Sequence, residues 1–152
     1  MRLTLEQAQA RYGVIQGGVW LDETKWCVLY TIPKGISLIN STGGIQQHIY
    51  CNRDILQPLD AAFYQILQRG LSAKLHTFDG CLMLRDVRGE PGKPSTHSYA
   101  CALDFDAETN KLGDVNGDMH PGIVECFKSQ GFSWGGDFSR VDKMHYSLAW
   151  ET

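Results

Sequence analysis

The chain has 152 residues, of which 43% are hydrophobic and 20% are charged, and its formal net charge is -3 at pH 7. These values are typical of a globular protein, and we expect residues 1–152 to form one domain around a single core. Lysine and arginine form no run or stripe, so the charge pattern gives no reason to expect a nucleic-acid partner. No apolar stretch reaches the roughly 18 residues of a membrane helix, so we expect no membrane span.

The cysteines and the N-terminal segment bear on the compartment. There are five cysteines, and none of them stands in a Cys-x-x-Cys pair. An odd number without such a pair argues against a disulfide framework or a cysteine-based zinc site, and favours a reducing compartment. The first residues lack the apolar core of a signal peptide. We therefore expect synthesis in the cytoplasm, with a monomer as the default state.

The N-terminal third predicts one short helix and two extended segments. Thr4 and Gln7 have the spacing of a capping box, and Gly13 is placed to end the helix that follows. The apolar run at 26–33 ends at a proline and predicts a strand, and residues 47–51 predict a second extended segment.

The remainder mixes helices and strands without a regular alternation. The clearest helix lies within 52–70, because Leu59, Phe63 and Ile66 share one face. The other expected elements are a strand over 73–87 bent at Gly80, a strand over 99–105, a helix over 121–131 and a strand over 145–150. This order predicts an α+β fold, with a small, mainly antiparallel sheet flanked by helices.

Two pairs of residues carry possible metal chemistry. His97 and Asp104 are seven residues apart, an odd spacing, so on one straight strand their side chains would point to opposite faces. They can meet only if the chain turns between them. Asp142 and His145, three residues apart, are close enough to be neighbours on a helical turn or a tight bend.

Two histidines and one carboxylate form a common catalytic zinc set, which leaves a fourth position for water. A further carboxylate beside the metal can act as a general base. His97, Asp104, His145 and Asp142 would supply these four groups. Spacing alone leaves the alternative open, because a single histidine is more often structural than a ligand.

These residues also lie in motifs that resemble a known family. The segment PSTHSYACALDFD, at 94–106, and the segment GFSWGGDFSRVDKMHYS, at 131–147, are similar to the zinc D-alanyl-D-alanine carboxypeptidases of the vancomycin-resistance type. They are closer still to the related phage L-alanyl-D-glutamate endolysins. The family pattern is Ser-x-His-x-x-Gly-x-Ala-x-Asp, followed later by an acidic residue, two residues and a histidine. The matching positions are Ser95, His97, Ala102, Asp104, Asp142 and His145.

The resemblance, which covers about residues 53–150, implies a fold and a set of roles. The fold would be the one shared with the zinc domain of hedgehog proteins. His97, Asp104 and His145 would hold Zn²⁺, Asp142 would be the general base, and Ser95 would hydrogen-bond the substrate. A cation is needed beside the developing oxyanion, and Arg85 is the first choice for it. Arg88 is the second choice.

Four positions depart from the family pattern. Ala100 replaces the glycine after the first histidine, Phe138 replaces a tryptophan, and Tyr146 and Ser147 replace the usual Phe-Glu pair. The missing acidic residue would remove one possible support of the metal ligands. None of these changes removes a ligand or the base.

By resemblance, the expected function is a zinc metallopeptidase that hydrolyses the stem peptides of peptidoglycan. We expect a phage endolysin that cleaves between L-Ala and D-Glu, stored in the cytoplasm and acting on the cell wall after release. The alternatives are a D-alanyl-D-alanine carboxypeptidase or dipeptidase, and a non-catalytic wall-binding or phage structural module.

Other polar residues have simpler interpretations. His48, His76 and His120 stand in no matching motif and are interpreted as structural. The acidic loop after Asp104 could suggest a calcium site of the EF-hand type. Such a loop has glycine at its sixth position, and no aspartate of this loop, taken as the first ligand, is followed by a glycine there. We therefore expect a solvated loop.

Overall fold

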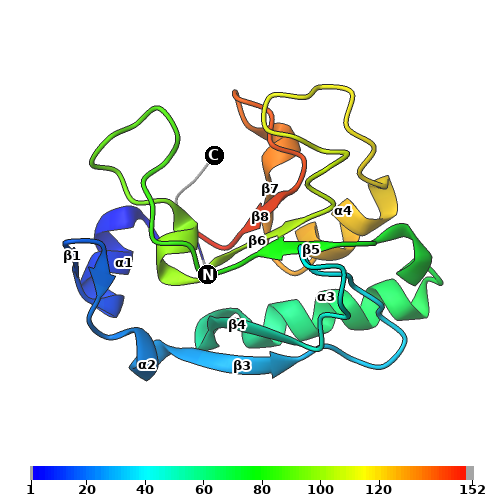
Figure 1. Ribbon diagram of the computed structural model, residues 1–152, viewed down its shortest axis with the longest axis horizontal. Coiled ribbons are helices and arrows are strands. Elements are labelled where there is room, and N and C mark those ends of the chain that lie inside the picture. Colours follow the sequence, from blue (N-terminus) through cyan, green and yellow to red (C-terminus); the bar gives the residue numbers. More distant parts are fainter. Residues whose placement is uncertain (1, 150–152) are drawn as a thin grey trace.

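The computed structural model describes residues 2–149 and has the expected α+β architecture, with short strands, four α-helices and several single-turn 3-10 helices (Figure 1). The α-helices are α1 (Leu5–Tyr12), α2 (Glu23–Trp26), α3 (Leu56–Gln68) and α4 (Pro121–Lys128). The strands are β1 (Ile15–Gln16), β2 (Val19–Trp20), β3 (Cys27–Thr31), β4 (His48–Asn52), β5 (Phe78–Gly80), β6 (Ala102–Phe105), β7 (Ser133–Trp134) and β8 (His145–Ser147).

The strands form three antiparallel groups. β1 pairs with β2, β3 pairs with β4, and a central four-stranded sheet has the order β5-β6-β8-β7. Within this central sheet, β6 pairs with β8 so that Asp104 lies directly opposite His145. The mainly antiparallel sheet predicted from the sequence is therefore confirmed.

Three of the expected strands are much shorter than predicted. The strand expected over 145–150 is only β8, which ends at Ser147, and residue 150 lies outside the described residues. Of the segment 73–87 only β5 is a strand, and its register shifts at Gly80, which has φ of 138°. Beyond this bend the chain leaves the sheet and bonds to a different partner, because Met83 N donates to the carbonyl of His97. The predicted strand over 99–105 likewise begins only at Ala102, since Tyr99 belongs to a 3-10 helix.

An aromatic cluster joins the central sheet to the two main helices. Phe63 of α3 and Phe127 of α4 both pack on Phe105 of β6, with ring centroids 6.1 and 5.5 Å apart. Tyr146 of β8 lies 4.4 Å from Phe127. All four rings are fully buried, so this face of the sheet forms much of the hydrophobic core.

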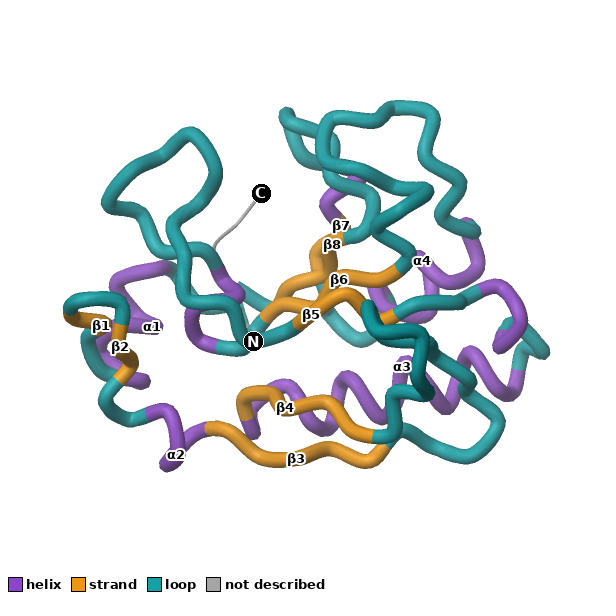
Figure 2. The backbone as a smooth tube through the Cα atoms, viewed as in Figure 1, coloured by secondary structure: helices purple, strands orange, loops and turns teal. Residues whose placement is uncertain are grey.

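Strand alternation then decides what the opposite face carries. Successive side chains of a strand point to opposite faces. Since Phe105 and Tyr146 face the helices, Asp104 and His145 must face the other way. In Figure 2 the long loops that follow β5 and β6 rise on one side of the sheet, away from α3. Asp104 and His145 therefore face the side of the sheet on which these loops lie.

The N-terminal helix is fixed by its cap and by an ion pair. The Thr4 hydroxyl accepts from Gln7 N and the Gln7 side chain accepts from Thr4 N, so the predicted capping box is present. Arg11 at the other end binds Asp54 with both nitrogens, at 2.6 and 3.1 Å. Tyr12 donates to the same carboxylate at 2.6 Å. These contacts tie α1 to the 3-10 helix η1 (Arg53–Ile55), which directly precedes α3.

Across residues 2–149, none of the helices combines the length and the apolar character that crossing a bilayer requires.

Candidate metal centre

His97 lies in the 3-10 helix η3 (Thr96–Tyr99), just before β6. The Ser95 hydroxyl caps this helix by accepting from His97 N, and the helix ends at Ala100, whose φ of 53° is left-handed. The left-handed residue reverses the chain direction, so that Ala100 N bonds back to the carbonyl of His97. This is the turn that the odd spacing of His97 and Asp104 requires, and it brings the two side chains together.

Three buried donor atoms meet at one point on the sheet. His97 Nε2 lies 3.2 Å from His145 Nδ1, and each of these nitrogens lies 3.2 Å from Asp104 Oδ1. Tetrahedral zinc with bonds of about 2.0–2.1 Å needs its ligands about 3.3 Å apart. The equal sides of the triangle therefore fit one metal ion bound to all three residues, and no other group of this kind occurs within residues 2–149.

The hydrogen bonding of His97 supports this assignment. His97 Nδ1 lies 2.7 Å from the carbonyl oxygen of Cys81, which can only accept, so Nδ1 carries the hydrogen. In the neutral ring Nε2 is then a bare acceptor that faces a carboxylate oxygen and a second imidazole. A cation satisfies such a set of acceptors, and a hydrogen bond from the far nitrogen commonly orients a metal-ligating histidine.

The charge of Asp104 is also consistent with a metal site. Burial by itself raises the pKa of the Asp104 carboxyl, but the charge of His97 in its protonated form and the hydrogen bonds that His145 and this form of His97 donate outweigh it. The pKa of Asp104 is therefore well below its usual value, and this carboxylate is ionised at neutral pH. An ionised, 6% exposed carboxylate between two imidazoles is a suitable ligand for a divalent cation.

Asp142 is held close to this group by a tight turn. His145 N donates to the Asp142 carbonyl at 3.1 Å, and Asp142 N donates to the Gly135 carbonyl at 2.8 Å. The two backbones approach so closely that a Cβ atom on Gly135 would lie 2.1 Å from the Asp142 oxygen. Only glycine fits here. The first glycine of the Trp-Gly-Gly-Asp segment thus sets the position of Asp142.

The donor triangle opens into a cavity of about 390 Å³. Asp104 and His145 are on its wall, and four of the five other predicted site residues line it as well: Arg85, Arg88, Ser95 and Asp142. The structure therefore brings together every site residue expected from the sequence, with His97 buried immediately behind.

Arg85 differs from its expected setting. The sequence predicts Arg85 on the strand before His97. In the structure it lies in the loop between β5 and η3, and this loop runs beside η3 rather than beside the sheet. Arg85 N donates to Ser98 Oγ at 3.1 Å, and the Arg85 carbonyl accepts from Ser95 N at 3.0 Å. These contacts hold the arginine backbone beside the histidine turn. Arg85 lines the cavity, and its Nη1 donates to the Asp86 carbonyl at 3.3 Å.

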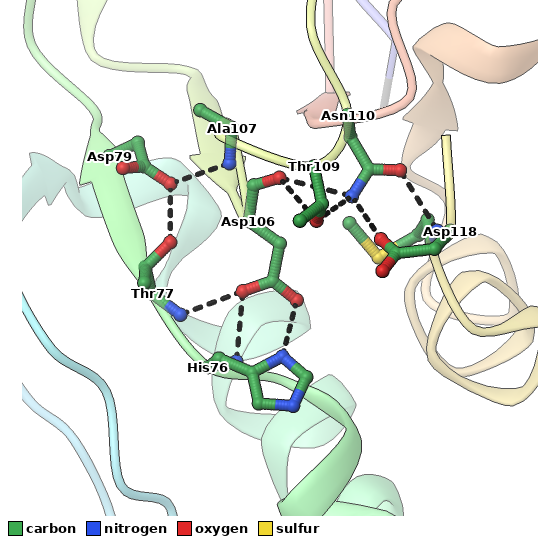
Figure 3. A network of polar contacts seen from close by, with 9 residues as sticks. His76, Thr77, Asp79, Asp106, Ala107, Thr109, Asn110 and Asp118 are labelled. Carbon is green, nitrogen blue, oxygen red and sulfur yellow. Dashed lines mark hydrogen bonds and ion pairs between the residues drawn. The ribbon is translucent and has the colours of Figure 1, made fainter. Parts of the chain in front are cut away.

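The opposite wall of the cavity belongs to the loop between β6 and α4, which contributes Ala107 and Leu112. Figure 3 shows how polar contacts fix the start of this loop. Asp106 Oδ1 accepts from His76 N at 2.9 Å and from Thr77 N at 2.7 Å, and Asn110 Nδ2 donates to the Asp106 carbonyl. Asp106 is thus bonded within the protein, rather than simply solvated as predicted, whereas Glu108 is exposed.

The positions that depart from the family pattern have identifiable surroundings. Ala100 adopts the left-handed conformation that glycine would adopt at no steric cost, so its methyl group strains the turn. Phe138 lines the cavity and packs on His145, with ring centroids 5.8 Å apart. Ser147 is fully buried, and its hydroxyl has no hydrogen-bond partner among the described residues.

The three remaining histidines all have contacts within the fold. His48 begins β4, and its Nδ1 lies 3.2 Å from Thr31 Oγ1. His76 bonds Asp106, and His120 caps α4 by accepting from Gly122 N at 3.0 Å. The sequence interpretation missed two contributors to the site. One is the carbonyl of Cys81, which no side-chain motif reveals. The other is Arg140, which lines the cavity and lies two residues before Asp142 in the second motif.

Comparison with known proteins supports the resemblance. Residues 88–148 match the profile of a protein family described as D-alanyl-D-alanine carboxypeptidase. This segment contains the three donor residues and Asp142, and the match confirms the family resemblance seen in the motifs. No curated protein matches the chain, and no solved structure matches it.

Proposed function

We infer from the family match of residues 88–148 that this chain is a zinc-dependent peptidase, and we propose the peptide stem of peptidoglycan as its substrate. The observation that carries the proposal is the triangle of His97 Nε2, His145 Nδ1 and Asp104 Oδ1, with sides of 3.2 Å. This triangle lies at the edge of a cavity that also holds a fourth ionisable side chain, Asp142.

The proposed roles follow from these positions. His97, Asp104 and His145 hold the zinc ion, which when bound supplies Lewis acidity and lowers the pKa of a water to about 7. Asp142 accepts a proton from the attacking water and passes it to the leaving amine. The neutral leaving group can then depart from the enzyme.

The other lining residues would bind the substrate. Arg85 is the proposed partner of the oxyanion that develops on the peptide carbonyl, because its loop is bonded to the histidine turn. Ser95 is buried and its hydroxyl caps the turn, so it lies at a fixed point of the cavity wall from which it can hydrogen-bond a peptide. Arg88 is exposed at the edge and is the second candidate for a substrate contact.

We propose cleavage between L-Ala and D-Glu, as in a phage endolysin that is made in the cytoplasm and acts on the wall after release. This preference comes from the motif resemblance. D-alanyl-D-alanine carboxypeptidase activity is the second candidate, because it is the description of the matched family. A non-catalytic binding module is disfavoured, since it has no need for Asp142 in the cavity.

Mass spectrometry of purified peptidoglycan digested by the protein, with and without a zinc chelator, tests the proposal. Stem peptides cut after L-Ala, and absent when the chelator is present, would support the endopeptidase. Loss of a single terminal alanine would identify the carboxypeptidase instead. If no product forms at any zinc concentration, the peptidase proposal is wrong.

A further inference from the structure

A second cavity, of about 410 Å³, lies at the edge of the central sheet. Its wall includes β7, the outermost strand in the order β5-β6-β8-β7, and the residues just before and after that strand. A volume of this size is typical of sites for small ligands. None of the residues with a role in the proposed reaction lines it.

An indole ring in a fixed position forms part of this wall. Trp134 of β7 and Phe138 both line the cavity and are only half-buried. Trp134 Nε1 donates to the Lys143 carbonyl at 2.8 Å. Gly136 lies so close that a Cβ atom there would be 2.2 Å from the Trp134 ring. The indole is therefore held in place before any ligand arrives, which lowers the entropic cost of binding.

A pair of opposite charges lies beside the indole. Lys128 of α4 forms an ion pair with Asp137, and its Nζ lies 5.8 Å from the centroid of the Trp134 ring. Both charged side chains line the cavity and are about half exposed, at 44% and 56%. An aromatic ring with a donor and an acceptor next to it suits a sugar. The C–H face of a pyranose packs on the ring, while its hydroxyl and acetamido groups hydrogen-bond the charged side chains.

The position of this cavity relative to the metal centre indicates which sugar it would take. Phe138 lines both cavities, and its ring centroid lies 5.8 Å from that of His145. In peptidoglycan the first L-Ala of the stem is joined through a lactyl group to an N-acetylated hexosamine. With only these two units between them, the sugar lies about 7 Å from a bond that is cleaved after L-Ala. For removal of the terminal D-Ala the separation is about 18 Å in an extended stem.

We propose that the cavity formed by Lys128, Trp134, Asp137 and Phe138 is a glycan subsite, which binds the N-acetylated hexosamine that carries the peptide stem. The inference rests on the proposed function, because the reach from the metal centre assumes cleavage after L-Ala. Stems that are still attached to the glycan strand are then better substrates than free peptides.

The test compares two ligands that differ only in the sugar. One is N-acetylmuramoyl-L-Ala-γ-D-Glu, and the other is N-acetyl-L-Ala-γ-D-Glu. Binding of each is measured by calorimetry to the zinc-loaded Asp142→Asn protein, which keeps both cavities but lacks the proposed base. We expect the ligand with the sugar to bind about tenfold more tightly, which is the size of one good contact with an aromatic ring.

Variants in the same background assign the preference to the cavity. Trp134→Leu should bring the ratio of the two affinities close to one and leave the binding of the sugar-free peptide unchanged. Trp26→Leu is the matched control, because Trp26 is also half-buried but lines neither cavity. Lys128→Met changes an exposed position and should lower the ratio about threefold, so it decides the question if Trp134→Leu does not fold by circular dichroism.

Three results would overturn the glycan subsite. They are equal binding of the two ligands by the protein with Trp134 and Lys128 intact, no binding of either ligand, and an unchanged ratio in the variants of these two residues. A loss of the ratio in Trp26→Leu as well would show that the effect is not specific to this cavity, and would also count against it.

Hydrolysis of the same two ligands by the protein with Asp142 intact separates this inference from the proposed function. A sugar preference in binding that depends on Trp134, without any hydrolysis, would leave the subsite standing and remove the peptidase proposal. Hydrolysis of both ligands at equal efficiency would do the reverse.

Discussion

At the scale of single residues, the chemistry depends on where Asp142 is held relative to the donor triangle. Its backbone is bonded on both sides, to Gly135 and to His145. The proposed base and a metal ligand are thus the two ends of one short turn. A change that removes the carboxylate without moving the turn should therefore separate metal binding from hydrolysis.

Asp142→Asn makes that change, since asparagine has nearly the same shape but cannot accept the proton. We expect hydrolysis to fall by about 10²- to 10⁴-fold, the usual contribution of a general base, with the zinc content unchanged. Rate measurement and metal analysis of the same sample check both parts. Survival of full activity would show that another group is the base.

Gly135→Ala moves the same carboxylate without removing it. The added methyl group would lie 2.1 Å from the Asp142 carbonyl oxygen, so the two backbones must separate. We expect kcat to fall by at least about tenfold, because a misplaced group near the reacting atoms costs up to about 10² in rate. Gly44→Ala is the matched control, since its nearest neighbour would be 3.6 Å away. Equal activity of the two variants would contradict this account of Gly135.

At the scale of elements, the loops around the cavity are fixed by a small number of buried polar contacts. Asp106 is left-handed, with φ of 50°, and its carboxylate joins the end of β6 to the segment before β5. Together with Asp79, whose Oδ2 accepts from Ala107 N at 2.9 Å, this side chain holds the start of the loop that contributes Ala107 and Leu112 to the cavity.

Asp106→Ala should therefore destabilise the protein more than Asp106→Asn does. Alanine removes the acceptor of His76 N and Thr77 N and is strained at positive φ, with an expected cost of about 2–3 kcal/mol. Asparagine keeps an oxygen for both amides and tolerates this conformation, so about 1 kcal/mol is expected. Urea unfolding of both variants measures the difference, and equal losses would argue against this role.

The contacts of Asp54 with Arg11 and Tyr12, which hold α1 in place, should make the stability of the fold depend on pH. The hydrogen bond from Arg11 lowers the pKa of Asp54, with Tyr12 adding to the effect and burial opposing it. A carboxyl whose pKa is lower in the folded state stabilises that state above its unfolded pKa of about 3.9, and loses this contribution as the pH falls through the folded value.

The melting temperature of Asp54→Asn should then lie below that of the unsubstituted protein at neutral pH, and the difference should shrink as the pH falls below about 4. Thermal unfolding followed by circular dichroism across this range provides the measurement. A difference that grows on acidification would have the wrong sign.

At the scale of the whole molecule, the metal would link segments that are distant in the chain. His97 comes from a turn, whereas Asp104 and His145 come from paired strands of the central sheet. An ion bound to all three therefore binds the folded chain only, and it must stabilise the fold by mass action.

We expect zinc at about 1,000 times its dissociation constant to add about 4 kcal/mol, which for a chain of this size corresponds to roughly 10 °C in melting temperature. A chelator should reverse the shift, and His145→Ala should abolish it. Asp142→Asn should retain it, because Asp142 is proposed as a base and not as a ligand. An unchanged melting temperature on adding zinc would show that the triangle is not a metal site.

Much of the architecture was predictable because local patterns are short-range. The capping box at Thr4 and Gln7 and the apolar face of α3 involve residues within a few positions of each other, and both predictions were confirmed. The strands over 73–87 and 99–105 were predicted too long, because the hydrogen bonds that end them come from elsewhere in the fold. Backbone groups of residues 83 and 85, which were predicted to continue the strand, form hydrogen bonds with the turn around His97 instead of with the sheet.

The sequence by itself determined the types and the order of the proposed ligands and the α+β class, since residue identity and periodicity can be read along the chain. Only the tertiary structure decided that His97, Asp104 and His145 converge, because this requires the left-handed Ala100 and the pairing of β6 with β8. It also decided which backbone carbonyl orients His97 and that Arg140 donates to the carbonyl of Arg88. These contacts join positions far apart in the chain, and so no spacing along the sequence can specify them.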